Sequence, residues 1–233
     1  MRKKVLVLAG GYSKERQISL QTGREVFKSL KKKYHVLLMD PKGDLVSKLS
    51  KIKPDIVFNA LHGRYGEDGY IQSILELQKI KYTHSGVRPS SLAIDKVLSK
   101  KIFKQKGILT PKGFKFKYSQ ILKKKNQNKI QKKLKFPVVI KPINEGSSVG
   151  VYICNKKNFI KNINKLNTYT EILVEKYIPG REIQAAIMGK QKLGAIELIP
   201  KRKFYDYQAK YDKKAKTKHV MPATIDSKNY KKV

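Results

Sequence analysis

Cysteine, arginine and acidic residues are all scarce in this chain of 233 residues. The one cysteine, Cys154, excludes an internal disulfide and is typical of a reducing compartment, so we expect a cytoplasmic protein. Cys154 lies in the strand-like run VGVYIC, which favours an inert core thiol over a reactive one. No apolar run approaches the ~20 residues that a membrane-spanning helix requires, and we expect no membrane partner.

Basic residues outnumber acidic residues 53 to 17, and the formal net charge of +36 suggests nucleic-acid binding as a first hypothesis. Only seven of the basic residues are arginine, the residue best suited to bidentate recognition of phosphates and bases. The lysines are spread over every segment, and the spacings of a zinc finger, an RRM and a basic zipper are absent. We therefore expect a solvated lysine surface and no specific nucleic-acid partner, with weak non-specific polyanion binding as a consequence.

The first part of the chain, roughly a hundred residues, alternates between short apolar runs and segments of helical periodicity. The predicted strands are Lys4–Leu8, His35–Asp40 and Ile56–Ala60, and the predicted helices run from Ser13 to about Lys32, over 44–52 and over Ile71–Lys79. This β-α-β alternation indicates an α/β fold with an open parallel sheet, whose ligands bind beyond the carboxyl ends of the strands.

Glu15 and His62 follow the first and third predicted strands, at the edge where a ligand is expected. A carboxylate can hold a substrate ammonium group, and a histidine can hold a substrate carboxylate. Each residue also has an ordinary interpretation. Glu15 can be a first-turn glutamate that answers the helix dipole, and His62 can be a loop histidine.

The stretch from Phe136 to Gly150, FPVVIKPINEGSSVG, has the features of a phosphate site. Its β-branched run predicts a buried strand that ends at Lys141. The Gly/Ser loop that follows, from Glu145 onward, places backbone N–H groups where they can approach an oxyanion. A lysine followed by such a loop suits polyphosphate binding. The spacing is neither that of a Walker loop nor that of a dinucleotide fingerprint, and a polar surface turn is the alternative.

The second half continues with a mixture of helices and strands. We predict one helix from Ser91 to Lys106, a surface helix over Lys123–Lys135, a strand over Ile172–Tyr177, and a hairpin of Glu182–Met188 with Lys192–Leu198. A disordered loop is the alternative for Lys123–Lys135. The lysine-rich stretch after Tyr211, DKKAKTKH, is expected to be flexible.

The string H62-G-R-Y-G-E-D-G-Y-I-Q-S73 resembles the N-terminal signature of the D-alanine–D-alanine ligases, members of the ATP-grasp superfamily. The resemblance extends over essentially the whole chain through G10-G-x-S-x-E-R-x-I-S19, KPxxEGSSVG and F204-Y-D-Y-Q-A-K-Y211. It implies two domains. Residues 1–90 would form an N-terminal, Rossmann-like substrate-binding domain, and 91–233 an ATP-grasp domain that is incomplete at its C-terminus.

The resemblance also implies roles for individual residues. Glu15, Ser147 and Tyr211 would form a catalytic, hydrogen-bonded trio around the donor alanine, with His62 and Lys210 as further substrate-binding residues. The ATP-binding residues would be Lys96, Lys141, Glu175, Lys176, Ile178 and Glu182. Among these, the backbone at Lys176 and Ile178 would meet the base, and Glu182 the ribose.

The activity implied is ATP-dependent ligation of two D-alanines through an acyl phosphate, for peptidoglycan synthesis, with Mg²⁺ or Mn²⁺ as metal and a homodimer as assembly. The family's metal ligands and phosphate-cradling arginine lie in R-x-D and E-x-N-x-x-P-G patterns, which residues 213–233 lack. The resemblance implies that these groups lie beyond Val233. We therefore expect no metal ligands within this chain and little activity from these 233 residues alone. The alternative is a non-catalytic remnant of the fold that binds nucleotide or polyanion.

Overall fold

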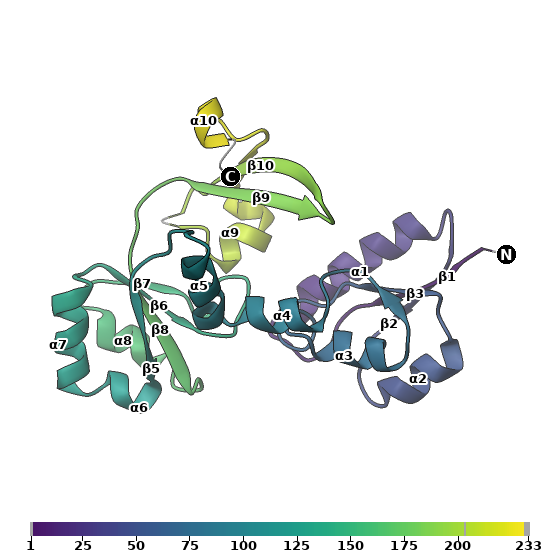
Figure 1. Ribbon diagram of the computed structural model, residues 1–233, viewed down its shortest axis with the longest axis horizontal. Coiled ribbons are helices and arrows are strands. Elements are labelled where there is room, and N and C mark those ends of the chain that lie inside the picture. Colours follow the sequence, from purple (N-terminus) through teal and green to yellow (C-terminus); the bar gives the residue numbers. More distant parts are fainter. Residues whose placement is uncertain (1, 203, 231–233) are drawn as a thin grey trace.

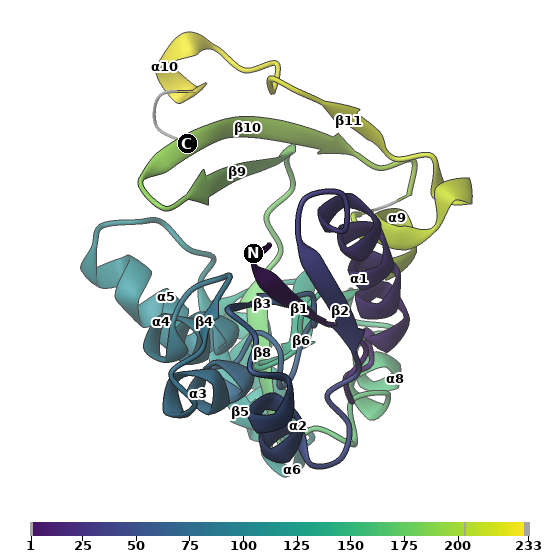
Figure 2. The same ribbon diagram turned by 90° about the vertical axis from the view of Figure 1, so that its right-hand side faces the viewer.

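The computed structural model describes residues 2–202 and 204–230 and contains three sheets, in the strand orders β2-β1-β3-β4, β5-β8-β6-β7 and β11-β10-β9. The first two lie at opposite ends of the molecule in Figure 1. The third lies to one side of both of them in the two views (Figures 1 and 2). Val233, the predicted last residue of the second domain, lies outside the described residues. No helix in the described ranges is both long and apolar enough to cross a membrane.

The N-terminal sheet is parallel throughout, as predicted. Its strands are β1 Lys4–Leu8, β2 His35–Met39, β3 Ile56–Asn59 and β4 Lys81–Tyr82, and its main covering helices are α1 Arg16–Leu30, α2 Leu45–Ile52 and α3 Tyr70–Leu77. Side chains of β1 alternate between the two faces. Leu6 and Leu8 pack in the cluster that contains Leu49 and Leu75 of α2 and α3, whereas Val7 packs with Val26 of α1.

Local hydrogen bonds set where the first helices begin. Ser13 was predicted to cap α1, but the cap is Glu15, two residues later, and the helix starts at Arg16. The Ser13 hydroxyl instead accepts the backbone N–H of Glu15 within a turn. Asp44 caps α2 by accepting the N–H of Ser47 at 3.0 Å.

The single helix predicted from Ser91 to Lys106 is wrong. The structure has α4 Val87–Ile94 and α5 Lys96–Gln105, separated at Asp95, whose backbone is extended at φ −79° and ψ 105°. The Asp95 carboxylate accepts the N–H groups of Val97 and Leu98 at 2.8 and 2.9 Å, so it caps a new helix. An N-cap carboxylate therefore ends the continuous helix that the apolar spacing predicted.

The central sheet is antiparallel and carries the second core. Its strands are β5 Gly113–Lys117, β8 Glu171–Lys176, β6 Val138–Pro142 and β7 Tyr152–Cys154, and its helices are α6 Tyr118–Ile121, α7 Lys124–Lys133 and α8 Phe159–Asn164. The predicted surface helix is confirmed as α7, which buries Ile130 beneath its lysines. Cys154 is fully buried, and burial raises the pKa of its thiol, as expected of an inert core residue.

The third sheet contains the predicted hairpin, β9 Glu182–Met188 and β10 Gln191–Ile199, together with β11 Lys218–Val220. Strand β11 comes from the lysine-rich stretch that was expected to be flexible. That expectation is wrong for this part because β11 pairs with β10 along one edge. Helix α9 Tyr207–Tyr211 and a 3₁₀ turn at Lys213–Ala215 lead into β11, and α10 Ser227–Tyr230 follows it.

Candidate functional site

Two lysines hold one buried carboxylate at the centre of the β5-β8-β6-β7 sheet. Glu175 of β8 is only 3% exposed. Lys141 of β6 places its Nζ 2.5 Å from Glu175 Oε2, and Lys100 of α5 pairs with Oε1. Lys141 lies opposite Leu173 on the neighbouring antiparallel strand, two positions from Glu175, so Lys141 and Glu175 are diagonal neighbours on one face of the sheet. Two cations on one carboxylate leave a net positive charge, which suits an anionic ligand.

Lys96 lies beside this group, at the start of α5. Its Nζ donates to the carbonyl oxygen of Ile143 at 3.3 Å and to that of Glu145. Burial, reinforced by the nearby charge of Lys141, lowers the pKa of Lys96 to about 8. The predicted phosphate-binding lysines therefore converge on one loop.

That loop, residues 144–150, has a compact and unusual backbone. Ser147 and Ser148 adopt left-handed conformations, with φ of 44° and 60°. Such conformations cost a side-chain-bearing residue roughly 1–3 kcal/mol, and they occur mainly at functional sites. A Cβ added to Gly146 would come 2.9 Å from Glu15 Oε2, so the loop approaches Glu15 closely only because residue 146 is glycine.

Ser147 and Tyr211 form a direct hydrogen bond, with their hydroxyl oxygens 2.5 Å apart. Ser148 makes a second link, donating from Oγ to the carbonyl oxygen of Tyr205 at 3.1 Å. Asp206 caps α9 by accepting the N–H of Ala209 at 2.8 Å. The segment 204–211 is therefore closed onto the Gly/Ser loop.

Of the predicted hydrogen-bonded trio, only the Ser147–Tyr211 bond is present among the described residues; Glu15 lies beside Gly146 without a hydrogen bond to Ser147 or Tyr211. Its side chain is 2% exposed, and its Oε2 has no hydrogen-bond partner in the described part of the chain. Burial raises the pKa of Tyr211, and the Glu15 carboxylate adds to the increase while the Ser147 hydrogen bond opposes it. A buried, unpartnered carboxylate is costly unless a cation or donor satisfies it.

His62 and Glu67 flank the same carboxylate. Thr22 Oγ1 lies 3.2 Å from His62 Nε2, and Glu67 Oε2 accepts the N–H of Gly63 at 2.8 Å. Burial raises the pKa of Glu67; the nearby Glu15 adds to this and His62 opposes it. Glu67 was not predicted as a site residue, although it lies within the H-G-R-Y-G-E-D-G string. Within the described ranges, no hydrogen bond or ion pair joins His62 to Ser147 or Tyr211.

Lys210 lies between Glu182 and Glu15. Burial lowers the pKa of the Lys210 ammonium group, and both carboxylates oppose that change. Burial also raises the pKa of Glu182, and Lys210 opposes that increase. The carboxylate of Glu182 on β9 and the ammonium group of Lys210 on α9 therefore lie close enough to influence each other's pKa.

The segment after β8 reaches two cavities. The Lys176 N–H donates to the carbonyl oxygen of Lys112 at 2.8 Å, so this N–H is already engaged. Ile178 is 57% exposed. Cavities of about 520 and 960 Å³ adjoin this segment, and both are lined by Tyr177 and Phe204.

A three-residue contact that was not predicted joins the β1–α1 loop to the Gly/Ser loop. Tyr169 donates from its hydroxyl group to Glu145 Oε1 at 2.8 Å, Lys14 Nζ lies 3.4 Å from the same oxygen, and Lys14 also donates to Tyr169. The three residues are separated by up to 155 positions, so no local pattern connects them. Lys100 was missed for the same reason.

Within residues 2–202 and 204–230, no three His, Cys, Asp or Glu side chains are arranged to hold a metal ion. Glu175 is already paired with two lysines, and Glu15 lies beside Glu67 without a third carboxylate. Magnesium requires carboxylate and phosphate oxygens around an open site. These residues do not fit a magnesium ion, and we derive no step through one. The predicted location of the family's metal ligands, beyond Val233, lies outside the described residues and stays a prediction.

A parallel sheet, two antiparallel sheets and a Gly/Ser loop that Lys96 contacts are the features expected of an ATP-binding protein of the ATP-grasp class. The family model described as "D-ala D-ala ligase C-terminus" matches residues 102–233, and that described as "D-ala D-ala ligase N-terminus" matches 41–85.

A relative from Pelagibacter ubique, the D-alanine–D-alanine ligase, is 58% identical over 238 residues, covering 100% of this chain and 77% of that protein. The crystal structure of the Bacillus anthracis D-alanine–D-alanine ligase has a TM-score of 0.81 at 34% identity, covering 97% of this chain and 73% of that one. Its complex with ATP has a TM-score of 0.77 at 29% identity, covering 96% and 72%. The chain belongs to the D-alanine–D-alanine ligase family.

Proposed function

We propose that this chain provides the amino-acid and nucleotide sites for ATP-dependent ligation of two D-alanines, a step in peptidoglycan synthesis. The observation that carries the proposal is the Glu15 carboxylate, which is buried, unpartnered at Oε2 within the described residues and adjacent to Gly146 of the phosphate loop. The ammonium group of an amino acid would supply the missing partner. The relatives are named D-alanine–D-alanine ligases, which supports D-alanine as that amino acid.

In the proposed reaction, a carboxylate oxygen of the first D-alanine attacks the γ-phosphorus of ATP. The bond to the β,γ-bridging oxygen breaks and ADP leaves. The amine nitrogen of the second D-alanine then attacks the carbonyl carbon of the acyl phosphate. The carbon–oxygen bond breaks, phosphate leaves and the nitrogen loses a proton. Water would hydrolyse the acyl phosphate, so the site must be closed during the reaction. The Ser147–Tyr211 and Ser148–Tyr205 hydrogen bonds would keep residues 204–211, the covering segment, closed over the Gly/Ser loop.

We assign electrostatic roles to the cations. Lys96 and Lys141 would neutralise the nucleotide phosphates, the dominant contribution of protein groups to phosphoryl transfer. Lys210 would bind the transferred phosphate and a substrate carboxylate from the side of Glu182. His62, which lies close to Glu67, would bind a D-alanine carboxylate.

For the nucleotide base, we propose recognition by the Lys176 carbonyl oxygen and the Ile178 N–H, with Glu182 on the ribose hydroxyls. The exposed Ile178 and the adjoining cavities support this placement. Glu175 would act indirectly in this arrangement, since it holds Lys141 in position from within the sheet.

We further propose a division into a substrate domain, 1–90, and an ATP-grasp domain, 91–233, in a cytoplasmic homodimer. The division is supported by the sheets, because the parallel sheet ends at Tyr82 and the antiparallel strands begin at Gly113. Family metal chemistry uses Mg²⁺ or Mn²⁺. Because residues 213–233 lack the R-x-D and E-x-N patterns, we propose that residues 1–233 alone bind ATP without turning it over.

The test is a fusion of residues 1–233 to the C-terminal segment of the Pelagibacter ubique relative, assayed with ATP, magnesium and D-alanine. We expect D-alanyl-D-alanine by mass spectrometry, and its loss in the same fusion carrying Glu15→Gln. The Glu25→Gln fusion is the control, because Glu25 is exposed on α1 and pairs only with Lys28 among the described residues. A folded fusion that binds ATP yet forms no dipeptide would contradict the proposal.

A further inference from the structure

A separate cavity lies within the N-terminal part of the chain, beyond the carboxyl ends of β1, β2 and β3. Its volume is about 460 Å³, within the range of small-molecule sites. Its lining includes Gly10–Tyr12 after β1, Pro41 and Gly43 after β2, and Leu61 and His62 after β3. This is the edge at which parallel α/β sheets bind ligands. His62, proposed above to bind a D-alanine carboxylate, lies at the edge of this cavity, whereas Glu15, Ser147 and the lysines of the nucleotide site do not line it.

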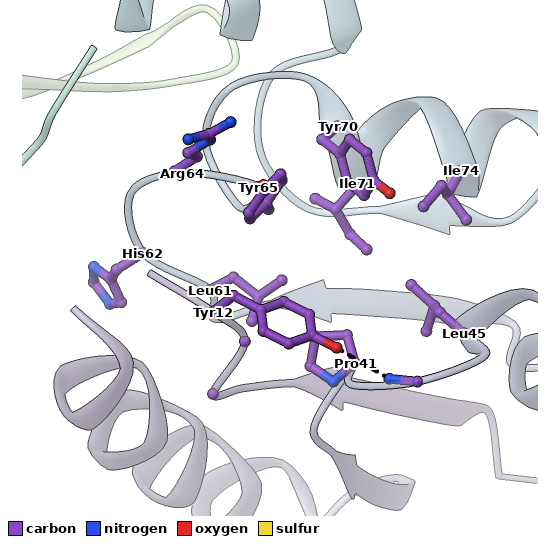
Figure 3. A pocket seen from close by; sticks show the side chains of 13 residues that line it. Tyr12, Pro41, Leu45, Leu61, His62, Arg64, Tyr65, Tyr70, Ile71 and Ile74 are labelled. Atoms are coloured by element: carbon purple, nitrogen blue, oxygen red, sulfur yellow. Dashed lines mark hydrogen bonds between the residues drawn. The ribbon is translucent and has the colours of Figure 1, made fainter. Parts of the chain in front are cut away.

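The cavity has the form of a slot between two walls, as Figure 3 shows. Tyr65, Tyr70 and Ile74 lie along one wall, and Tyr12 and Pro41 lie along the other. A slot with tyrosine rings on both sides suits a flat ligand, because aromatic rings contact one another well by stacking or edge-on approach.

The tyrosines are held in place although they are accessible. Tyr12 and Tyr70 are 64% and 57% exposed. Tyr65 lies edge-on to both, with ring centroids 6.4 Å from Tyr12 and 5.1 Å from Tyr70. The Tyr12 hydroxyl oxygen accepts the N–H of Gly43 at 3.2 Å. The rings are therefore ordered before a ligand binds, which lowers the entropic cost of binding.

Positive charge accompanies these rings. Arg64 Cζ lies 4.9 Å from the centroid of Tyr65, and Lys42 Nζ lies 5.6 Å from that of Tyr12. Neither cation forms an ion pair within residues 2–202 and 204–230. The nearby acids are already engaged: Asp40 pairs with Arg16 at 2.5 Å, and Asp68 accepts backbone N–H groups. Asp40 also lies close enough to Lys42 for the lysine charge to lower its pKa, but it is paired with Arg16. An anionic group on a ligand would thus find positive charge that no close ion pair among the described residues engages.

The two ends of the slot differ in polarity. His62 and Arg64 lie at one end in Figure 3, and Leu45 and Ile74 lie at the other. A ligand with an apolar ring and one anionic end matches this arrangement. We propose that the cavity is a second ligand site, which takes a small planar aromatic molecule carrying a carboxylate or phosphate group.

The probe for this proposal is 2-naphthoate, titrated into residues 1–233 and followed by NMR. We expect saturable one-site binding with a Kd on the order of 0.1–1 mM, given the size of the molecule. Neutral 2-naphthamide should bind roughly fivefold to tenfold more weakly because it lacks the charge. Excess ATP should leave naphthoate binding unchanged, since the nucleotide site lies elsewhere.

Two substitutions separate the ring contribution from the charge contribution. Tyr12→Ala should weaken naphthoate binding by roughly tenfold, and Arg64→Gln by roughly fivefold. Arg24→Gln is the matched control, because Arg24 is exposed on α1 and does not line the cavity. Tyr70→Ala serves as a second ring variant if the thermal melt of Tyr12→Ala is altered. Absence of saturable binding at about 10 mM probe, displacement by ATP, or unchanged affinity in both the ring and the charge variants would overturn the proposal.

Discussion

The hydroxyl groups of Ser147 and Tyr211 lie 2.5 Å apart and join the phosphate loop to α9, across 64 positions of sequence. Ser147 follows Gly146, which approaches Glu15, and Tyr211 ends the helix that carries Lys210. This one bond therefore connects residues 204–211 to the loop at which we propose that the amino-acid and phosphate sites meet.

Removing that bond should open the covering segment. Tyr211→Phe deletes a hydroxyl group whose hydrogen bond is worth about 1 kcal/mol, so the closed form should be roughly fivefold less favoured. We expect faster tryptic cleavage after Lys210 and Lys214 by about that factor. Tyr207→Phe is the control, since it changes the ring that packs 5.0 Å from Tyr211 without touching the Ser147 bond. Equal cleavage rates in the two variants would contradict the role of the bond.

Lys141→Met should weaken ATP binding by at least roughly tenfold, or about 1.4 kcal/mol. The substitution removes a phosphate-facing cation and leaves Glu175 with Lys100 as its remaining ion-pair partner among the described residues. Calorimetric titration with ATP measures the change. Lys115→Met is the control, because Lys115 pairs with Glu171 near the surface. Unchanged affinity in Lys141→Met, in a variant with a normal thermal melt, would contradict the nucleotide assignment.

Binding of ATP should weaken as the pH rises above about 8, the pKa of Lys96. The protonated ammonium group binds phosphate, and deprotonation removes that charge before the other lysines titrate. Stability should change in the opposite direction. Because the folded-state pKa is lowered from 10.5, the unfolded chain binds more protons, and Lys96 contributes increasing stability from about pH 8 to about 10.5.

The Lys96→Met variant isolates both effects. Its ATP affinity should be lower and nearly independent of pH between about 7 and 9, whereas the parent chain should lose affinity across that range. Parallel pH profiles for the two proteins would show that another group titrates.

The salt dependence of binding distinguishes the proposed nucleotide site of a ligase from the alternative, a general polyanion-binding surface. With a net charge of +36, the chain should bind a DNA duplex weakly and lose that binding by orders of magnitude between about 50 and 200 mM salt. ATP binding in the enclosed lysine site should fall far less over the same range. Identical salt slopes for duplex and ATP would favour a general polyanion surface over a nucleotide site.

Local patterns predicted the parallel sheet because β1 and β3 are short apolar runs and their connecting helices have clear periodicity. The same local patterns failed at Asp95. The apolar spacing continues across this residue, but the Asp95 carboxylate caps a new helix and so separates α4 from α5. They also failed after Tyr211, where pairing with β10 orders a lysine-rich stretch.

The candidate site likewise contains residues that local patterns predicted and residues that they missed. Lys141 and the Gly/Ser loop were visible as a local pattern, and family resemblance supplied the residues around them. Lys100 was not visible, because it reaches Glu175 across 75 positions. The contact of Lys14 with Tyr169 and Glu145 likewise depends on the packing of two distant loops. Long-range ion pairs leave no periodic trace in a sequence.

We propose that Glu15 binds the ammonium group of D-alanine beside the nucleotide. The most direct measurement is a calorimetric titration of D-alanine into residues 1–233 saturated with a non-hydrolysable ATP analogue. We predict saturable binding that Glu15→Gln weakens by at least roughly tenfold, while Glu25→Gln leaves it unchanged. Equal D-alanine affinity in the parent chain and Glu15→Gln, with both proteins folded and holding the analogue, would contradict the account.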